Sequence, residues 1–249
     1  MDIKKYLNRI GISKIENPTL KFLTKLQNRH MLSIPFEDLD IPDRERIVLD
    51  NSHIYQKIIL TKRGGFCYEL NGLFHWLLTE LGFKVDMLSA RVYSHEQKNY
   101  SPEFDHMTLL VHLEKDYLTD VGFGDSFRKP IEMPTGELKD ISGNYRIINI
   151  NNFYYLQRFE DEEWIPQYMF TTEPRKFEDF YERCDYQQDN PDSHFRNRIV
   201  CSIATPTGRI TLSNNSITIT DLEIKKREEF KTEEEFLQLL KEHFSIELK

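Results

Sequence analysis

Three residues of this 249-residue chain have the types and spacing for nucleophilic catalysis: Cys67, His106 and Asp120. Cys67 follows two glycines and opens a stretch in which leucine and phenylalanine recur at the spacing of one helical face. The unpaired N–H groups and the dipole at a helix N-terminus favour a thiolate over a thiol. The other interpretation is that Cys67 is a small buried apolar residue, which is the role of many intracellular cysteines.

A thiolate nucleophile needs a base, and the base needs a group that orients it. Among the eight histidines, His106 opens an apolar run, Met107 to Val111, directly after a loop that contains Pro102. Such a ring is fixed by a strand and can still face a cleft. His75 lies on the same predicted helix as Cys67 but two turns away from it, so His106 is the better candidate.

Asp120 ends the next apolar run and precedes Gly122-Phe123-Gly124. A turn at residues 114–116 makes the two runs neighbours, and counting back from it pairs Asp120 with residues 106–108. A lone buried aspartate costs free energy unless it is paired, and an imidazole N–H is a natural partner. Taken singly, these residues could also be a core histidine and a turn-capping aspartate; taken together, they predict a Cys-His-Asp triad.

The elements that must position this triad change from helical to strand periodicity after Gly82. We expect helices over residues 3–10, from Asn17-Pro18 to about residue 34, over 52–60 and over 67–81. Strands are predicted over 84–93, 106–113, 116–121, 145–150 and 153–159 as an antiparallel sheet or barrel, with Pro166 on an edge or in a loop. A helix near 175–185, two or three strands between 199 and 219, and a last helix opened by a capping box at Thr232 follow. This predicts an α+β protein with a helical subdomain (1–83), a β-barrel subdomain (84–170) and an α/β lid (171–249), packed as one unit.

Composition limits the classes of function. The net charge of −8 argues against a nucleic-acid partner. Three cysteines make a disulfide framework improbable and fit a reducing cytoplasm. The N-terminus lacks the apolar run of a signal peptide, and no stretch approaches the ~18 apolar residues of a membrane span. We therefore expect a cytoplasmic protein with no membrane partner and no metal site.

Four segments together resemble the arylamine N-acetyltransferase family: RGGFCYELN, IPFEDLDI, the histidine in DHMTLLV, and DVGFG. The order and spacing also fit, with 39 residues from Cys67 to His106 (106 − 67) and 14 from there to Asp120 (120 − 106). The later NPDSHF and TPTG segments extend the resemblance over essentially the whole chain. The RGG-x-C-x-E-x-N motif is specific, whereas the other segments are weaker alone.

The resemblance implies a helical bundle, a β-barrel and an α/β lid around a cysteine-protease-like core. It also implies that Cys67 is the nucleophile, His106 the base and Asp120 the residue that orients the base. The expected reaction moves an acetyl group from acetyl-CoA to an arylamine or hydrazine by a ping-pong mechanism through a cysteine thioester, with acetyl-CoA as donor substrate and no permanently bound cofactor.

Residues that contact the substrates are expected around the triad. The Gly122-Phe123-Gly124 loop lacks bulk at its glycines and can approach a pantetheine or phosphate, and Phe195 is expected beside the coenzyme. Arg128 and Lys129 are candidates for its phosphates or are solvated charges. The aromatic walls of the cleft are expected to include Phe36, Tyr68, Phe123 and Phe195, although each could be ordinary core.

Three points remain open in the sequence. Arg63 either binds a substrate anion or forms a structural ion pair with a carboxylate of the Phe36-Glu37-Asp38 loop, and the family resemblance implies Glu37 as that partner. A cysteine hydrolase, either a peptidase or a transglutaminase-like enzyme, would use the same triad, and a non-enzymatic module of the same fold is disfavoured because all three triad positions are filled. The acceptor amine, the acyl-chain preference and the oligomeric state are not determined.

Overall fold

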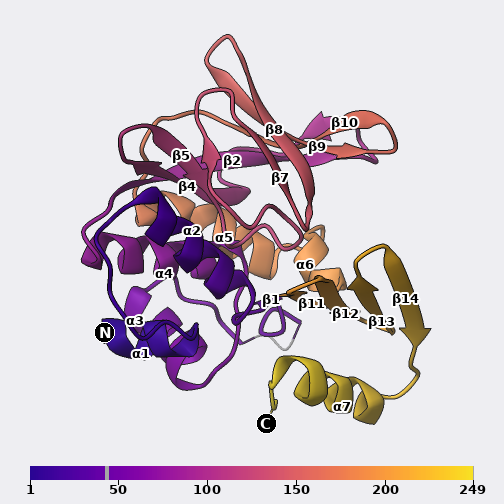
Figure 1. Ribbon diagram of the computed structural model, residues 1–249. Coiled ribbons are helices and arrows are strands. Elements are labelled where there is room, and N and C mark those ends of the chain that lie inside the picture. Colours follow the sequence, from indigo (N-terminus) through magenta and orange to yellow (C-terminus); the bar gives the residue numbers. More distant parts are fainter. Residues whose placement is uncertain (43–44, 249) are drawn as a thin grey trace.

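The computed structural model describes residues 1–42 and 45–248 (Figure 1). The helices in chain order are α1 (Ile3–Arg9), α2 (Leu20–Met31), α3 (Asn51–Tyr55), the π-helix η1 (Gln56–Leu60), α4 (Cys67–Glu80), the 3₁₀-helix η2 (Phe177–Phe180), α5 (Tyr181–Asp189), α6 (His194–Asn197) and α7 (Glu233–Phe244). The strands are β1 (Phe36–Glu37), β2 (Lys84–Ser94), β3 (Asn99–Tyr100), β4 (His106–His112), β5 (Asp116–Thr119), β6 (Ile131–Glu132), β7 (Glu137–Asp140), β8 (Gly143–Ile150), β9 (Phe153–Glu160), β10 (Glu163–Phe170), β11 (Val200–Thr205), β12 (Gly208–Ser213), β13 (Ser216–Asp221) and β14 (Ile224–Glu229).

The N-terminal helices form where capping and apolar periodicity coincide. The Asp2 carboxylate caps α1 by accepting from the backbone N–H groups of Lys4 and Lys5. The prediction that Asn17-Pro18 opens the second helix is wrong by two residues, because Thr19 caps α2 by accepting from the N–H of Phe22. Helix α4 is buried on almost every side along its first three turns, so it serves as the central support for the residue at its start.

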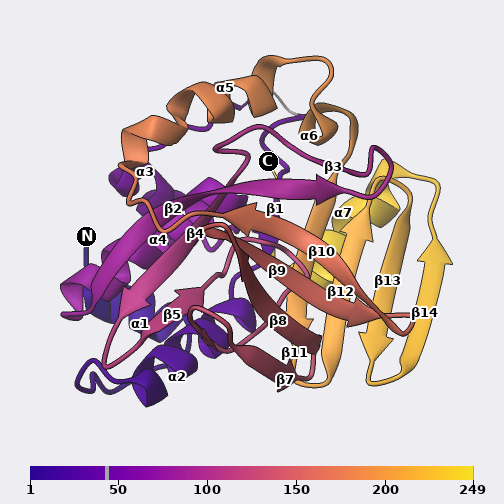
Figure 2. The same cartoon turned by 90° about the horizontal axis from the view of Figure 1, so that it is seen from above.

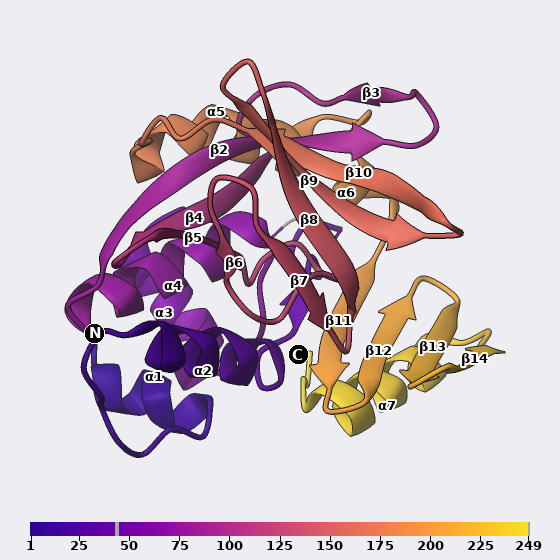
Figure 3. The same cartoon turned by 45° about the horizontal axis from the view of Figure 1, so that its top comes forward.

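A nine-stranded antiparallel sheet follows, in the order β6-β5-β4-β2-β10-β9-β8-β7, with β3 paired to β2. The sheet curves until its two end strands, β6 and β7, lie close to each other, which makes a nearly closed barrel (Figure 3). In the register of β4 and β5, Leu109 lies opposite Thr119. Asp120 therefore leaves β5 beside the start of β4, as the hairpin count predicted.

Pro166 lies in a strand, so the expectation of a loop is wrong. Strand β10 pairs with β9 along residues 163–170 but with β2 only at residues 168–170, so Pro166 lies where the strand is paired on one side, as expected of an edge position. The register with β9 also shifts between Pro166 and Tyr168, just before the pairing with β2 begins.

The C-terminal part is built on a second antiparallel sheet, β1-β11-β12-β13-β14, with α7 packed against it (Figure 1). Its first strand, β1, comes from the N-terminal third, where Phe36 pairs with Ser202. This pairing crosses the expected division at residue 83. Strand β14 was not predicted; it is exposed and highly charged, so it lacks the alternation of a half-buried strand.

Helix α5 lies along one side of the molecule, near β2 and α4 (Figure 2). The apolar core of the helical part extends into β2 and β4, and a separate cluster fills the barrel. Within residues 1–42 and 45–248, no helix is long and apolar enough to cross a membrane. The expected α+β fold class, with helices, an antiparallel barrel-like sheet and a mixed C-terminal part, is confirmed.

Candidate active site

Cys67 is the first residue of α4, and the turn before it is tightly packed. A Cβ atom on Gly64 would lie 2.2 Å from the carbonyl oxygen of Pro35, so only glycine fits there. The backbone N–H of Phe66 donates to Glu69 Oε2 at 3.1 Å and closes the first turn of the helix. Cys67 is 4% exposed, so its sulfur sits in a largely closed site.

His106, the first residue of β4, and Asp120, the residue after β5, form a buried pair. His106 Nε2 lies 2.7 Å from Asp120 Oδ2, and the two residues are 2% and 0% exposed. Tyr168 donates its hydroxyl to the same carboxylate oxygen at 3.0 Å. Because an ionised Asp120 holds the proton on Nε2, Nδ1 is the ring nitrogen that can accept a proton.

Two contacts bring this pair to the helix that carries Cys67. Asn71, one turn after Cys67 on α4, donates its amide to Asp120 Oδ1 at 2.9 Å and accepts from the N–H of Val121 at 3.0 Å. Gly122 lies against the first turn, where an added Cβ would be 2.9 Å from both the Cα and the carbonyl oxygen of Cys67. These contacts bring the His106–Asp120 pair to the first turns of the helix that begins with Cys67.

Burial acts differently on the two acids of the site. It raises the pKa of the Cys67 thiol well above its usual value, and the Asp105 carboxylate adds to this, while the Met107 N–H opposes it. These effects oppose the preference for a thiolate that the helix N-terminus provides. Burial also acts to raise the pKa of Asp120, but the charge and hydrogen bond of His106 and the donors from Asn71 and Gly122 hold it below the usual range. Cys67 thus needs a base to take its proton, and Asp120 stays ionised beside that base.

Aromatic side chains surround the pair. Phe123 is half-buried, with its ring centroid 5.0 Å from that of His106 and 4.9 Å from that of Tyr168. Phe195 is half-buried and lies edge-on to Phe66, the residue before Cys67, at 5.9 Å. These two predicted wall residues are therefore adjacent to the triad.

The other two predicted wall residues are placed differently. Tyr68 is fully buried, packed against Phe66 and Phe180, and its hydroxyl donates to the carbonyl of Phe104 at 2.6 Å. Of the two roles considered for Tyr68, wall of the cleft or ordinary core, this packing favours the core. Phe36 is half-buried in β1 and is bridged to Gly65, so it supports the turn before Cys67.

Arg128 was considered for a coenzyme phosphate or a solvated charge, and it is neither in this structure. It is 2% exposed, and its guanidinium donates to Ser142 Oγ and to the carbonyls of Thr205 and Gly208. It therefore joins the barrel to the β11–β12 hairpin of the second sheet. Lys129 is exposed and stays a candidate.

Arg63 forms the ion pair expected for it. Its Nε lies 2.9 Å from Glu37 Oε1 and its Nη2 lies 3.1 Å from Glu37 Oε2. Asp40 also accepts from Arg63, and Lys57 lies 2.9 Å from Glu69 Oε1. This cluster ties the loop after α2 to the turn before Cys67.

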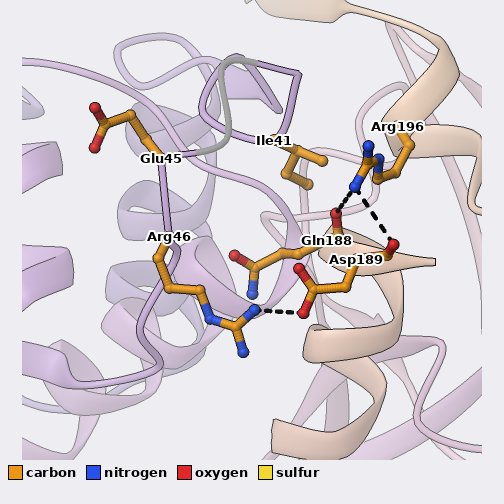
Figure 4. Close-up of a pocket in the computed structure, with 6 residues that line it drawn as sticks. All are labelled: Ile41, Glu45, Arg46, Gln188, Asp189 and Arg196. Carbon is orange, nitrogen blue, oxygen red and sulfur yellow. Dashed lines mark hydrogen bonds and ion pairs between the residues drawn. The ribbon is translucent and has the colours of Figure 1, made fainter. Parts of the chain in front are cut away.

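A separate pocket of about 330 Å³ lies between the segment after β1 and the α5–α6 region (Figure 4). Arg46 Nη1 lies 2.5 Å from Asp189 Oδ2, and Arg196 donates to the carbonyls of Gln188 and Asp189 at 3.4 Å. Its two arginines are already engaged by acceptors on α5, and it contains no member of the triad. We therefore interpret this pocket as part of the contact between the end of α5 and the segment that contains Arg46.

Sequence reasoning missed three residues that hold Asp120. Asn71 was visible within the RGG-x-C-x-E-x-N motif, one turn after the cysteine, but was given no role. Tyr168 carried no signal because it comes from β10, 48 residues away from Asp120. Gln27 of α2 donates to the carbonyl of Asp120 at 3.2 Å, also without a local signal. Across the residues that the structure describes, no group of three or more His, Cys, Asp or Glu could hold a metal ion.

Comparison with known proteins places this site in a family. The N-acetyltransferase family model matches residues 19–249. A pineal gland isozyme of arylamine N-acetyltransferase from Gallus gallus and arylamine N-acetyltransferase 1 from Homo sapiens are each 34% identical, over 100% of this chain and 95% of theirs. The solved structure of the arylamine N-acetyltransferase from Salmonella typhimurium superposes with a TM-score of 0.94 at 28% identity, covering 98% of this chain and 90% of that one. The chain therefore belongs to the arylamine N-acetyltransferase family, and it is an acetyltransferase.

Proposed function

We propose that this enzyme transfers an acetyl group from acetyl-CoA to the nitrogen of an arylamine, arylhydrazine or related amine, through a thioester on Cys67. The observation that carries the proposal is the buried His106–Asp120 pair, held at 2.7 Å and bound by Asn71 to the helix that begins with Cys67. A cysteine, a base and an orienting carboxylate are the groups that nucleophilic acyl transfer requires.

The first half-reaction acylates the enzyme. His106 Nδ1 takes the proton of the Cys67 thiol, and Asp120 stabilises the imidazolium that forms. The thiolate adds to the carbonyl carbon of acetyl-CoA, and the tetrahedral intermediate collapses with cleavage of the C–S bond to CoA. The departing CoA sulfur takes the proton from His106, so free CoA and acetyl-Cys67 result.

The second half-reaction transfers the acetyl group. The amine nitrogen attacks the thioester carbonyl and loses a proton to His106, and that proton returns to the Cys67 sulfur as the N-acetyl product leaves. The N–H groups of the first turn of α4 have no partner within the helix and can stabilise the oxyanion in both steps, a contribution of about 3–4 kcal/mol per donor in other enzymes.

The residues near the triad suit these two substrates. Gly124 is only half-buried and its loop is the candidate path for the pantetheine chain, whereas Gly122 is buried against α4. Phe123 and Phe195 provide faces for a flat aromatic amine. The burial of Cys67 and His106 keeps water away from the thioester. This favours transfer to an amine over hydrolysis, and the enzyme needs acetyl-CoA as a donor substrate, with no permanently bound cofactor.

Steady-state kinetics test the proposal. Because one sulfur carries the acetyl group between the two substrates, CoA must leave before the amine reacts. Double-reciprocal plots against an arylamine at several acetyl-CoA concentrations should be parallel. Intersecting lines would mean direct transfer within a ternary complex, and cleavage of a peptide substrate without amine acetylation would identify a hydrolase.

A further inference from the structure

Asp105, the residue directly before His106, is held by two side chains of α5. Its Oδ1 accepts from Arg183 Nε at 2.8 Å and from Gln187 Nε2 at 2.6 Å, and Arg183 Nη2 lies 2.6 Å from the same oxygen. Residues 183 and 187 are one helical turn apart and share a face of α5. The side chains of Asp105 and Arg183 are 13% and 19% exposed, so solvent screens this pair only in part.

Both donors are themselves oriented. The Arg183 guanidinium carbon lies 4.1 Å from the centroid of the Tyr186 ring, a cation–π contact. Gln187 Oε1 accepts from the hydroxyl of Ser193 at 2.8 Å. Ser193 lies two residues before Phe195, so the contacts of Asp105 extend to the segment that carries a proposed substrate wall.

The backbone before Asp105 is constrained as well. Phe104 has a φ of 64°, a left-handed conformation that a bulky residue rarely adopts. Its N–H donates to Ser89 Oγ at 2.7 Å and its carbonyl accepts from Tyr68 at 2.6 Å. Such a conformation persists only where its surroundings fix it, so the placement of His106 depends on the segment that Asp105 fastens to α5.

Asp105 also places a negative charge near the nucleophile, where it opposes ionisation of the Cys67 thiol. The other titratable groups around Cys67 are His106 and Asp120 beside β4 and β5, Cys184 on α5, and Tyr68 on α4. Arg183 is the cation that contacts the Asp105 carboxylate. Its charge therefore balances that of Asp105, the residue next to His106.

We propose that Arg183 is a positioning residue for this active site: with Gln187 it fixes Asp105 and the mouth of β4, and its charge offsets the carboxylate beside Cys67. The inference rests on Cys67 as the proposed nucleophile, but it concerns the thiol itself. It can therefore be tested without acetyl-CoA or an amine.

The test is the rate at which neutral iodoacetamide alkylates Cys67, followed by peptide mass mapping across a pH series. In Arg183→Gln the uncompensated Asp105 charge should raise the midpoint of the rate-against-pH curve by roughly half to one pH unit. At a pH below that midpoint, alkylation of Cys67 should then be about 3- to 10-fold slower than in wild type. Asp105→Asn should shift the profile the opposite way, because Arg183 is then unneutralised. The double variant Asp105→Asn/Arg183→Gln should return to the wild-type profile, and Arg183→Lys, which keeps the charge, should stay close to it.

If the contact of Arg183 and Gln187 with Asp105 served only to hold α5 in place, Arg183→Gln should be alkylated faster, because loosening α5 exposes Cys67. Equal or faster alkylation in Arg183→Gln, or a double variant that keeps the shift of Arg183→Gln, would overturn the proposal. Slow labelling of Cys184 and Cys201 in every variant checks the fold. If Arg183→Gln does not fold, the pH midpoint of Asp105→Asn decides, because the charge effect lowers that midpoint whereas exposure of Cys67 raises the rate at every pH and leaves the midpoint unchanged. The proposed function fails separately, if the wild-type enzyme does not acetylate an amine or if Cys67→Ala still does, whatever the alkylation profiles show.

Discussion

Gly122 lies so close to Cys67 that no side chain fits between them: an added Cβ would be 2.9 Å from the Cys67 carbonyl oxygen and 2.7 Å from Asn71 Nδ2. Gly122 thus lies against both Cys67 and Asn71, the residue that holds Asp120. Because glycine has no side chain, the loop after β5 can lie in direct backbone contact with the first turn of α4, and the geometry of the site depends on this contact.

Gly122→Ala should therefore impair catalysis more than folding. The methyl group must displace Cys67 or Asn71, and a misplacement of about 1 Å at an active site can cost on the order of 100-fold in rate. Gly124→Ala is the matched control, because Gly124 has a φ of +76° but no atom within 4 Å of its added Cβ. It should cost about 1 kcal/mol of stability and little of kcat, with any effect of the methyl group on the pantetheine chain confined to the KM for acetyl-CoA. A similar kcat in the two variants would contradict the close contact as the reason for glycine at 122.

Asp120→Asn should keep the fold and lose most of the rate, by about 10⁴-fold, as for the orienting aspartate of a serine protease. The amide cannot accept from Asn71, Gly122, Tyr168 and His106 together, so the imidazole loses its orientation and its counter-charge. Tyr168→Phe removes one donor and keeps the carboxylate, so it should reduce kcat far less. Near-normal turnover in Asp120→Asn would remove Asp120 from the catalytic role.

Arg63→Ala should lower stability without weakening coenzyme binding. It leaves the fully buried Glu37 carboxylate without its bidentate partner, a loss of about 3 kcal/mol for a buried pair broken on one side. Thermal unfolding and the KM for acetyl-CoA should be measured together, with Arg63→Lys as an intermediate that keeps the charge. A large rise in KM at unchanged melting temperature would show that Arg63 binds a substrate anion instead.

Asp38 should make stability depend on pH. Burial and the charge of Glu37 raise its pKa to about 7, although the Val200 N–H opposes this. In the unfolded chain the pKa is about 3.9, so between these values the folded state binds a proton that the unfolded state releases. The free energy of unfolding should therefore fall as pH rises, by about 1.4 kcal/mol per pH unit from this group.

Urea unfolding of wild type and Asp38→Asn at about pH 5 and pH 7 tests this effect. The asparagine oxygen can still accept from Val200 but does not titrate, so the variant should gain about 2–3 kcal/mol relative to wild type between the two pH values. Asp161→Asn, in an exposed turn, should show no such gain. A constant difference between Asp38→Asn and wild type would disprove the raised pKa.

Local patterns predicted the parts of the site that lie close in sequence. The β4–β5 hairpin could be counted because its turn is short and its strands are apolar, and this placed Asp120 beside His106. The start of α4 was recognisable from the glycines before Cys67 and the apolar face behind it. The Arg63–Glu37 pair was predicted from the family resemblance, since 26 residues separate the two.

Residues whose roles depend on distant partners could not be predicted. Arg128 reads as a surface charge, but its acceptors lie 77 and 80 residues away on the β11–β12 hairpin. Asp105 is held by Arg183 and Gln187, which follow it by 78 and 82 positions in the chain, and nothing local in α5 indicates these contacts. The proline correctly indicated one-sided pairing at residue 166, but the register shift after it and the pairing of residues 168–170 with β2 could not be predicted, because bulges leave little trace in a single sequence.

The central claim, that Cys67 carries the acetyl group, is tested most directly by the mass of the intact protein after mixing with acetyl-CoA in the absence of amine. We expect a mass increase of one acetyl group, mapped to the peptide that contains Cys67 and lost when an arylamine is added, as the N-acetyl product forms. Cys201→Ala should acetylate like wild type, and Cys67→Ala should stay unmodified. An unmodified Cys67 in an enzyme that turns over, or an acetyl group mapped to another residue, would contradict the account.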